Sequence, residues 1–417
     1  MGLNVHYNFK PEIDQPTCSL VRNYHNINWD VKNPGAPITF PICVNRVNWE
    51  TLYSSWTAQG FEVKVNLQFG SLGPSSENYE SLWDGHLDWA EQYAYSVAQG
   101  LSQSDLATSI EIGNEPGVRF NDDLYQTLFQ RMSEGIRRAD PEIKIATCTV
   151  HMGPADKYHK NLEETFGAPD MLPLFDVINV HVYSDKDEKD QSHPWERSYP
   201  EDPAIDYLRR VDEVIEWRDQ YAPEKEVWIT EFGYDSCTPE AMKERKGWFL
   251  QLDWSGQTDL QQAQWTIRSL LCFSAREIDR AYIYFYNDKD EASVHAASGL
   301  TRNFIPKPAF WAVQQFQQLL GSYQFSRKLK EEPGHLYAYE FIDPNQPTHP
   351  IWVLWSPTGE DRQTEAHLQQ LPKPPKSLLK MAVDAKDTSH ETSKQRWTQE
   401  GQGIRFPVGE SPLFLLF

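Results

Sequence analysis

Two glutamates in this 417-residue chain end short strand-like runs, and each stands two positions before a glycine. Glu115 lies in Ile110-Glu-Ile-Gly-Asn-Glu-Pro-Gly117, where Pro116 removes a backbone donor and must end the strand. Glu231 lies in Val227-Trp-Ile-Thr-Glu-Phe-Gly-Tyr234, which repeats the pattern. A carboxylate at a strand tip suits general acid work on a polar substrate. The simpler alternative for Glu115 is a cap on its loop or on the helix that follows.

The presence of two such carboxylates favours catalysis over capping. A pair of carboxylates at the C-terminal ends of two strands is what retaining glycoside hydrolysis requires, with the carboxyl groups about 5 Å apart. The nucleophilic carboxylate must stay ionised, which a nearby Arg cation and a Tyr hydroxyl would favour. The acid/base carboxylate needs a raised pKa, which the negative charge of the nucleophile would supply.

The elements that would position these glutamates alternate strand and helix patterns. Strands are predicted at residues 2–7, 18–24, 61–69, 143–150, 175–183, 226–232 and 280–286, and in a run that begins at Ile110. Helices are predicted at residues 48–59, 85–100, 156–166, 206–221, 260–276 and 308–320, and after Asn121-Asp122. The first two strands are too close in sequence for a regular crossover helix. The pattern therefore predicts an α/β fold, a (β/α)8 TIM barrel with a degenerate first unit.

After Gly321 the helical periodicity disappears, and short strand-like runs separated by turn residues follow to the C-terminus. This pattern is typical of a small antiparallel β-sandwich, whose apolar last run would be locked into a sheet. We therefore expect a catalytic barrel over residues 1–321 and a β-sandwich accessory domain over residues 322–417. Packing support for the barrel is the favoured role of the second domain, with a sugar-binding module as the alternative.

Functional groups of a barrel sit at the C-terminal ends of its strands, so the strand tips can be inspected directly. The polar and aromatic side chains at these tips are Arg22, Asn114, Glu115, His181, Tyr183, Glu231, Tyr284 and Tyr286. His181 and Tyr183 alternate and so face the same side. We predict that Tyr183 donates its hydroxyl to Glu231, and that Asn114 binds a sugar 2-hydroxyl. Each side chain alone also has a purely structural explanation.

Five stretches together resemble the clan A glycoside hydrolases. They are Asn114-Glu115-Pro116, His181-Val-Tyr183, Thr230-Glu231-Phe-Gly, and Ser298-Gly-Leu-Thr with Pro306-Lys-Pro-Ala-Phe-Trp311. A barrel followed by a β-sandwich resembles family 39 of that clan, with family 5 a close second. The resemblance implies that Glu115 is the acid/base and Glu231 the nucleophile, and Arg22 matches the clan's early-strand Arg loosely. Many members carry a Trp on strand eight, where this chain has Tyr282-Ile-Tyr-Phe-Tyr286.

The predicted loops after strands six and seven, residues 184–203 and 234–259, are long enough to shape a cleft. They carry the aromatic residues Trp195, Tyr199, Trp248, Phe249 and Trp254. Aromatic side chains spread over two loops favour an open groove and attack within β-linked oligo- or polysaccharides, with Trp254 as a substrate-binding residue. The alternatives are an exo-acting β-glycosidase with a walled pocket, and aromatic side chains that only anchor their loops.

The composition argues against several other kinds of partner and site. A formal charge of −21 argues against nucleic acid or an anionic membrane as partner, and the chain contains no 18-residue apolar run. The five cysteines lack zinc or disulfide spacing, and His25, His151 and His181 stand alone on different strands, so we expect no metal. Without a dinucleotide or phosphate-binding motif we also expect no cofactor.

The competing class is a non-catalytic carbohydrate-binding barrel protein, against which the presence of both glutamates argues. No signal peptide precedes Gly2, so the compartment stays open between secreted and cytoplasmic. The oligomeric state and the sugar specificity stay open as well.

Overall fold

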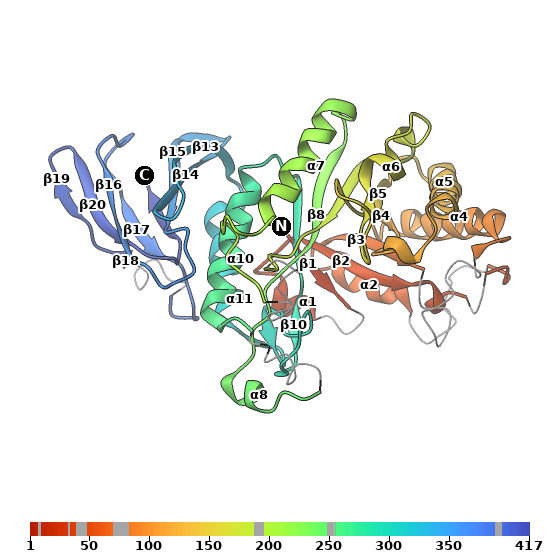
Figure 1. Ribbon diagram of the computed structural model, residues 1–417, viewed down its shortest axis with the longest axis horizontal. Coiled ribbons are helices and arrows are strands. Elements are labelled where there is room, and N and C mark those ends of the chain that lie inside the picture. Colours follow the sequence, from red (N-terminus) through yellow and green to blue (C-terminus); the bar gives the residue numbers. More distant parts are fainter. Residues whose placement is uncertain are drawn as a thin grey trace. The chain divides into compact units, whose positions relative to one another are not determined.

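The computed structural model describes residues 1–6, 10–31, 34–38, 48–69, 83–186, 196–247, 254, 256–387 and 394–417. The chain forms two compact units, whose elements are labelled in Figure 1. The first unit comprises Met1–Val182, Arg209–Phe232 and Ile278–Ile283. The second comprises Tyr183–Leu208, Gly233–Glu277 and Tyr284–Phe417.

A closed parallel barrel is the centre of the first unit. In chain order its strands are β1 (Gly2–Val5), β2 (Leu20–Asn26), β3 (Glu62–Gln68), β4 (Ser109–Ile112), β5 (Lys144–His151), β7 (Val177–His181), β8 (Glu226–Phe232) and β9 (Arg280–Ile283). Each strand pairs with its neighbour in sequence, and β1 pairs with β9 to close the barrel. A short strand, β6 (Lys160–Asn161), extends the pairing from β5. The predicted eight-stranded barrel is therefore confirmed.

The barrel interior has an apolar floor beneath a polar layer. Ala146, Val177, Trp228 and Tyr282 pack together as a buried cluster. Above them lie polar side chains that are also buried, namely Asn4, Arg22, Lys64, Asn66 and Glu111. Because side chains alternate along a strand, the apolar partners of these residues on β3, such as Val63 and Val65, face outward. The polar layer departs from the branched aliphatic filling usual in such barrels.

Helices connect the strands of the first unit. They are α1 (Pro11–Asp14), α2 (Trp49–Thr57), α4 (Leu87–Gln103), α5 (Asp122–Ala139), α6 (Leu162–Phe166) and α7 (Tyr207–Tyr221), with 3-10 turns η1 (Ile27–Trp29), η2 (Gly117–Arg119) and η3 (Leu172–Leu174). The single turn of α1 replaces the first crossover helix, in agreement with the predicted degenerate first unit. Asn121 caps α5 by accepting from the backbone N–H of Leu124.

Several predicted elements are shorter than expected, and three of them differ in ways that matter for the site. Strand β7 ends at His181 rather than at residue 183, and β9 ends at Ile283 rather than at residue 286. The pairing of β8 with both neighbours shifts register near these ends, and such irregularities terminate ladders. The helix predicted from residue 156 begins only at Leu162, because the Asp156 side chain accepts from nearby backbone N–H groups and holds a turn instead.

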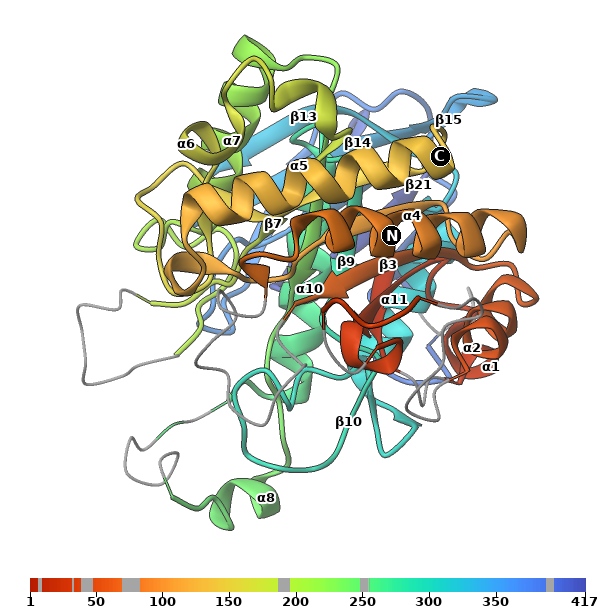
Figure 2. The ribbon, with the colours of Figure 1, turned by 90° about the vertical axis from the view of Figure 1, so that its right-hand side faces the viewer.

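Helices α4 and α5 run side by side, as Figure 2 shows, and Gly135 lies at their contact. A Cβ atom at this position would lie 2.3 Å from the backbone oxygen of Glu91. Gly135→Ala should therefore lower the free energy of unfolding by about 1–3 kcal/mol, although alanine is the better helix former. Chemical denaturation would measure the change against Gln130→Ala, an exposed position on the same helix. Unchanged or increased stability would contradict the close contact.

The second unit contains helices α8 (Pro239–Lys243), α10 (Asp259–Ser274) and α11 (Pro308–Leu320). A small sheet combines β10 (Asn287–Asp288), β11 (Thr301–Arg302) and β12 (Ile305–Pro306). The larger antiparallel sheet has the order β13 (Gln324–Glu332), β14 (Leu336–Asp343), β15 (Gln346–Trp355), β21 (Leu413–Leu416), β17 (Ser377–Lys380) and β18 (Lys394–Gln395). A further sheet has the order β16 (Thr364–Leu368), β20 (Gly403–Val408) and β19 (Thr398–Glu400).

One apolar core is shared by the last two sheets. Side chains of the larger sheet, such as Leu354 and Leu415, pack with Ala366 and Phe406 of the smaller one. Two antiparallel sheets on a common core form a β-sandwich, so this prediction is confirmed. Strand β21 lies between β15 and β17, which locks the apolar end of the chain into the sheet as expected.

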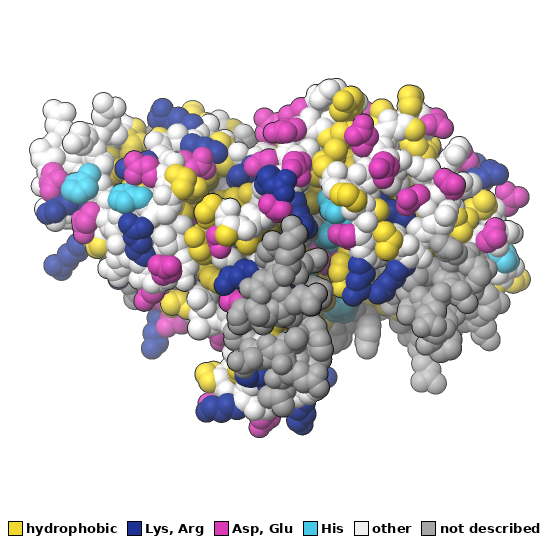
Figure 3. Space-filling model, in the orientation of Figure 1, with side chains coloured by type: hydrophobic (Ala, Val, Ile, Leu, Met, Phe, Trp, Pro, Cys, Tyr) yellow, Lys and Arg dark blue, Asp and Glu magenta, His cyan; other side chains and the backbone are white. Residues whose placement is uncertain are grey.

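The molecular surface in Figure 3 carries acidic and basic side chains interspersed with one another on the face shown. Among the described residues, every helix is too short or too polar to cross a membrane.

Candidate active site

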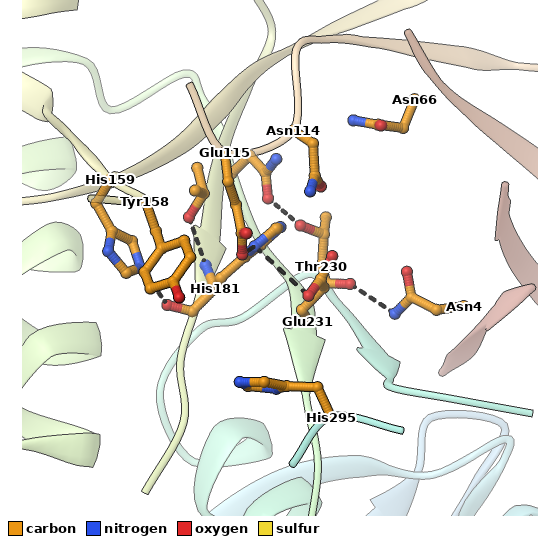
Figure 4. A network of polar contacts seen from close by, with 12 residues as sticks. Asn4, Asn66, Asn114, Glu115, Tyr158, His159, His181, Thr230, Glu231 and His295 are labelled. Carbon is orange, nitrogen blue, oxygen red and sulfur yellow. Dashed lines mark hydrogen bonds and ion pairs between the residues drawn. The ribbon is translucent and has the colours of Figure 1, made fainter. Parts of the chain in front are cut away.

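Glu115, His181 and Glu231 converge at the C-terminal ends of the barrel strands (Figure 4). Glu231 belongs to β8, and its side chain is only 6% exposed, whereas that of Glu115, in the loop after β4, is 26% exposed. One carboxylate oxygen of each glutamate and a ring nitrogen of His181 lie within 4.8 Å of one another. The Nδ1 atom of His181 is 2.9 Å from Oε1 of Glu115 and 3.7 Å from Oε2 of Glu231. The two carboxylates are thus close, but their surroundings differ.

Glu231 is held by a cation and a hydroxyl on β2. Nη1 of Arg22 donates to its Oε1 atom at 2.9 Å, and the Tyr24 hydroxyl donates to the same oxygen at 2.7 Å. Arg22 also lies over the Tyr24 ring, with its guanidinium carbon 4.8 Å from the ring centroid. Both donors stabilise a carboxylate over a carboxylic acid. The arrangement favours the carboxylate form of Glu231 and fixes its orientation.

Arg22 is itself fixed by Glu111 on β4. Its Nε and Nη2 atoms donate to the two Glu111 oxygens at 2.8 and 2.6 Å, and Lys64 forms an ion pair with Glu111 at 2.9 Å. Burial alone would raise the pKa of the Glu111 carboxyl, but Arg22 and Lys64 lower it to about 2. Burial lowers the pKa of Lys64 to about 8 despite the attraction of Glu111. A bidentate pair of this kind leaves the guanidinium little freedom to turn.

Asn4 connects the donors on β2 to the backbone beside Glu231. Its Oδ1 atom accepts from Nη1 of Arg22 at 2.8 Å and from the Tyr24 hydroxyl at 3.0 Å. Its Nδ2 atom donates to the backbone oxygen of Thr230 at 2.8 Å. The amide of Asn4 accepts on its oxygen and donates from its nitrogen, so it satisfies buried groups on both sides.

Asn114 precedes Glu115 and is oriented by the same arginine. Its Oδ1 atom accepts from Nη2 of Arg22 at 2.7 Å. Because a guanidinium can only donate, the oxygen of the amide must face Arg22, which leaves the NH2 group to act as a donor elsewhere. This orientation agrees with the predicted role of Asn114 as a donor to a sugar hydroxyl, which stays a prediction.

The structure brings five of the predicted residues together in the first unit, namely Arg22, Asn114, Glu115, His181 and Glu231. The other four, Tyr183, Trp254, Tyr284 and Tyr286, belong to the second unit. There Tyr183 packs edge-on against His295 at 4.7 Å between ring centroids and lies beneath Arg197. Trp254 is buried, and Tyr286 contacts the Phe304 ring.

The predicted hydroxyl contact of Tyr183 with Glu231 stays a prediction. Of the loop aromatic residues, Trp195, Trp248 and Phe249 lie outside the described residues. Tyr199 is described, and its ring lies under Arg268, with the guanidinium carbon 5.4 Å from the centroid.

Sequence reasoning missed the residues that hold Arg22 and Glu231. They are Asn4, Tyr24 and Glu111, together with Lys64 and Asn66, which contact Glu111. Glu111 carried a usable signal, because a charged residue between two isoleucines of an apolar strand requires a buried partner. Tyr24 carried another, since it alternates with Arg22 and must share its face of the strand.

Tyr24→Phe tests the importance of the hydroxyl on Glu231. Losing a charged hydrogen bond, worth about 1.5–3 kcal/mol, should reduce turnover roughly ten- to a hundred-fold. It should also move the acidic limb of the kcat/KM profile to higher pH, because a carboxylate that loses a donor is protonated more easily. Tyr95→Phe, on α4, is the control. An unmoved pH profile would show that the hydroxyl does not stabilise the carboxylate.

No protein-family model matches the sequence, and no curated protein matches it. Solved structures do match over the whole chain. A family 39 glycoside hydrolase from the gut symbiont Bacteroides cellulosilyticus WH2 has a TM-score of 0.72 and 15% identity, with 80% of its own chain covered. A glucosidase from Croceicoccus marinus has a TM-score of 0.64, 12% identity and 94% coverage. CelM2, a bifunctional glucanase-xylanase from a metagenome library, has a TM-score of 0.59, 12% identity and 95% coverage.

At such low identity the likeness shows a shared fold. It agrees at that level with the resemblance to clan A and to family 39 that the sequence motifs indicated.

Proposed function

We propose that this protein is a retaining glycoside hydrolase that cleaves β-linked sugars by double displacement. The observation that carries the proposal is the spacing of Glu115 and Glu231, which have carboxylate oxygens within 4.8 Å of each other. Retaining enzymes place their two carboxyl groups about 5 Å apart, whereas inverting enzymes need roughly 6.5–9.5 Å to admit a water molecule.

The surroundings of the two carboxylates assign their roles. Glu231 is buried, and the Arg22 and Tyr24 donors favour its carboxylate form, so it suits the nucleophile that forms the covalent glycosyl-enzyme. Glu115 is the more exposed carboxylate, and among the described residues its side chain contacts the ring of His181 but no Lys or Arg. It suits the group that protonates the leaving oxygen and then deprotonates the attacking water.

His181 lies between the two carboxylates. Its Nδ1 atom faces Oε1 of Glu115 at 2.9 Å, and Nη2 of Arg22 approaches its Nε2 atom at 3.5 Å. Because the arginine can only donate, the neutral imidazole places its hydrogen on Nδ1 and donates it to Glu115. This bond stabilises Glu115 as a carboxylate after it has given its proton to the leaving group.

The comparisons support the proposal by analogy, because the similar structures described above are glycoside-cleaving enzymes. A non-catalytic carbohydrate-binding barrel would have no use for a buried carboxylate oriented by an arginine and a tyrosine, since keeping such a network ionised in the interior is costly.

A panel of aryl β-glycosides tests the activity. Wild type should hydrolyse at least one of them and release the β-anomer first, as followed by NMR. Glu231→Gln should lose this activity, whereas Glu142→Gln, at an exposed site on the same unit, should keep it. Product sizing on β-linked polysaccharides would then separate attack within chains from attack at their ends. Binding of sugars without hydrolysis by wild type would show a carbohydrate-binding protein instead.

A further inference from the structure

The turn between β5 and β6 brings together two histidines and an aspartate that the sequence separates. His151 ends β5, Asp156 lies in the turn, and His159 precedes β6. The three side chains are partly buried, and one donor atom from each lies within 4.8 Å of the others. The expectation that His151 stands alone was therefore wrong, because it considered only strand tips. In Figure 4, His159 and Glu115 lie on different sides of His181.

The hydrogen bonds of the two histidines determine where their lone pairs point. Nε2 of His151 is 2.9 Å from the backbone oxygen of Pro154, and Nε2 of His159 is 3.3 Å from that of His181. A carbonyl oxygen only accepts, so each Nε2 atom carries a hydrogen. In a neutral imidazole the Nδ1 atom then presents a lone pair.

Both Nδ1 atoms face the Asp156 carboxylate. The Nδ1 atom of His159 is 3.0 Å from both carboxylate oxygens, and that of His151 is 4.0 Å from Oδ2. Lone pairs directed at a carboxylate repel it unless a proton or a cation lies between them. The carboxylate cannot turn away, because its Oδ1 atom accepts from the backbone N–H groups of Tyr158 and His159 at 2.7 and 2.8 Å.

We propose that Nδ1 of His151, Nδ1 of His159 and the Asp156 carboxylate form a binding site for a divalent transition-metal ion of the zinc type. Imidazole nitrogen with one carboxylate suits Zn²⁺, Co²⁺ or Ni²⁺ rather than Ca²⁺ or Mg²⁺. Tetrahedral zinc bonds of about 2.0–2.1 Å place neighbouring ligand atoms about 3.3 Å apart. The distance from Nδ1 of His159 to the Asp156 oxygens, 3.0 Å, is close to this value, and Nδ1 of His151, at 4.0 Å from Oδ2 of Asp156, would have to approach the carboxylate by less than about 1 Å.

The two backbone carbonyls that fix the Nε2 hydrogens are the outer partners that metal-ligating histidines generally have. The cluster of Glu115, His181 and Glu231 is not proposed as a metal site, because the Arg22 guanidinium already provides a cation at Glu231.

The metal-binding turn is attached to the segments that carry the catalytic groups. The backbone N–H of Val118, in the 3-10 turn after Glu115, donates to the Asp156 backbone oxygen at 2.7 Å. The approach beside it is so close that a Cβ atom at Gly117 would lie 2.3 Å from the Lys157 oxygen. His159 in turn contacts the backbone of His181. A bound ion would brace the Glu115 loop and the end of β7 without taking part in bond cleavage.

Metal titration of the chelator-treated protein tests the site without reference to hydrolysis. Wild type should bind one equivalent of Zn²⁺ by calorimetry and gain about 3 °C in Tm at a hundred-fold excess over Kd. His151→Ala and His159→Ala should each weaken binding at least about a hundred-fold. Asp156→Asn should do the same while it preserves the turn, since an amide oxygen can still accept from both N–H groups.

Two control variants show whether Zn²⁺ binds at this turn rather than elsewhere on the protein. His367→Ala removes an exposed histidine whose Nδ1 atom lies 3.5 Å from Glu400, and Glu231→Gln alters the other cluster. Both should bind Zn²⁺ as wild type does. The proposal is overturned if wild type binds no Zn²⁺ or Co²⁺, which would mean that a proton on His159 balances Asp156. It is equally overturned if the His151 and His159 variants bind normally or if Glu231→Gln abolishes binding.

Discussion

Glu231→Ala should reduce hydrolysis on the order of 10⁴-fold for activated and unactivated substrates alike, because every turnover passes through the nucleophile. The substitution leaves a cavity where Nη1 of Arg22 and the Tyr24 hydroxyl lose their shared acceptor. A small anion can enter this cavity and be stabilised by the same two donors. Added azide should therefore restore measurable turnover with an activated aryl β-glycoside.

The configuration of the azide product distinguishes a nucleophilic role of Glu231 from an acid/base role. Azide in the place of Glu231 attacks the face opposite the leaving group and gives the α-glycosyl azide. In Glu115→Ala, azide instead attacks the glycosyl-enzyme and gives the β-glycosyl azide, which makes that variant a matched control. NMR of the isolated products distinguishes the two. A β-azide from Glu231→Ala, or residual activity close to wild type, would show that another group is the nucleophile.

The barrel could be predicted because its signals are local. Alternating strands, helix caps and the prolines and glycines after strands are properties of short stretches, and both glutamates stand directly at such strand ends. The polar layer was harder to predict because it forms across strands. Alternation shows that Lys64 and Asn66 share one face of β3, but only barrel closure shows that this face meets Arg22 and Glu111.

The tyrosine at Glu231 and the histidine cluster illustrate two further limits. Tyr24 lies two residues after Arg22, and Tyr183 lies two residues after His181. Sequence spacing therefore gave no reason to prefer Tyr24 over Tyr183 as the hydroxyl donor to Glu231. His151 and His159 meet because β5 and β6 pair and because the Asp156 side chain holds a turn by accepting from the backbone. The sequence from residue 156 fits the start of a helix as well as a turn, and such hydrogen bonds decide between the two.

Glu115→Ala should lower kcat/KM by an amount that depends on the leaving group of the substrate. A glycoside with a poor leaving group needs its oxygen protonated as the bond breaks, so its kcat/KM should fall about 10²–10⁴-fold. A dinitrophenyl glycoside needs little protonation, so its kcat/KM, which reports formation of the glycosyl-enzyme, should fall much less. Its kcat and KM should fall together, because Glu115 is also needed to activate the water that hydrolyses the intermediate.

The contacts of Glu115 explain why the loss should depend on the leaving group. Glu115 contacts His181 but not Arg22, so its removal leaves the donors on Glu231 in place. The nucleophile should therefore remain competent, and mass spectrometry should detect an accumulated glycosyl-enzyme with the activated substrate. Glu115→Gln, which keeps the volume and an acceptor for His181, should behave in the same way. Equal losses of kcat/KM on both kinds of substrate would contradict the acid/base role, because loss of a purely structural group cannot depend on the leaving group.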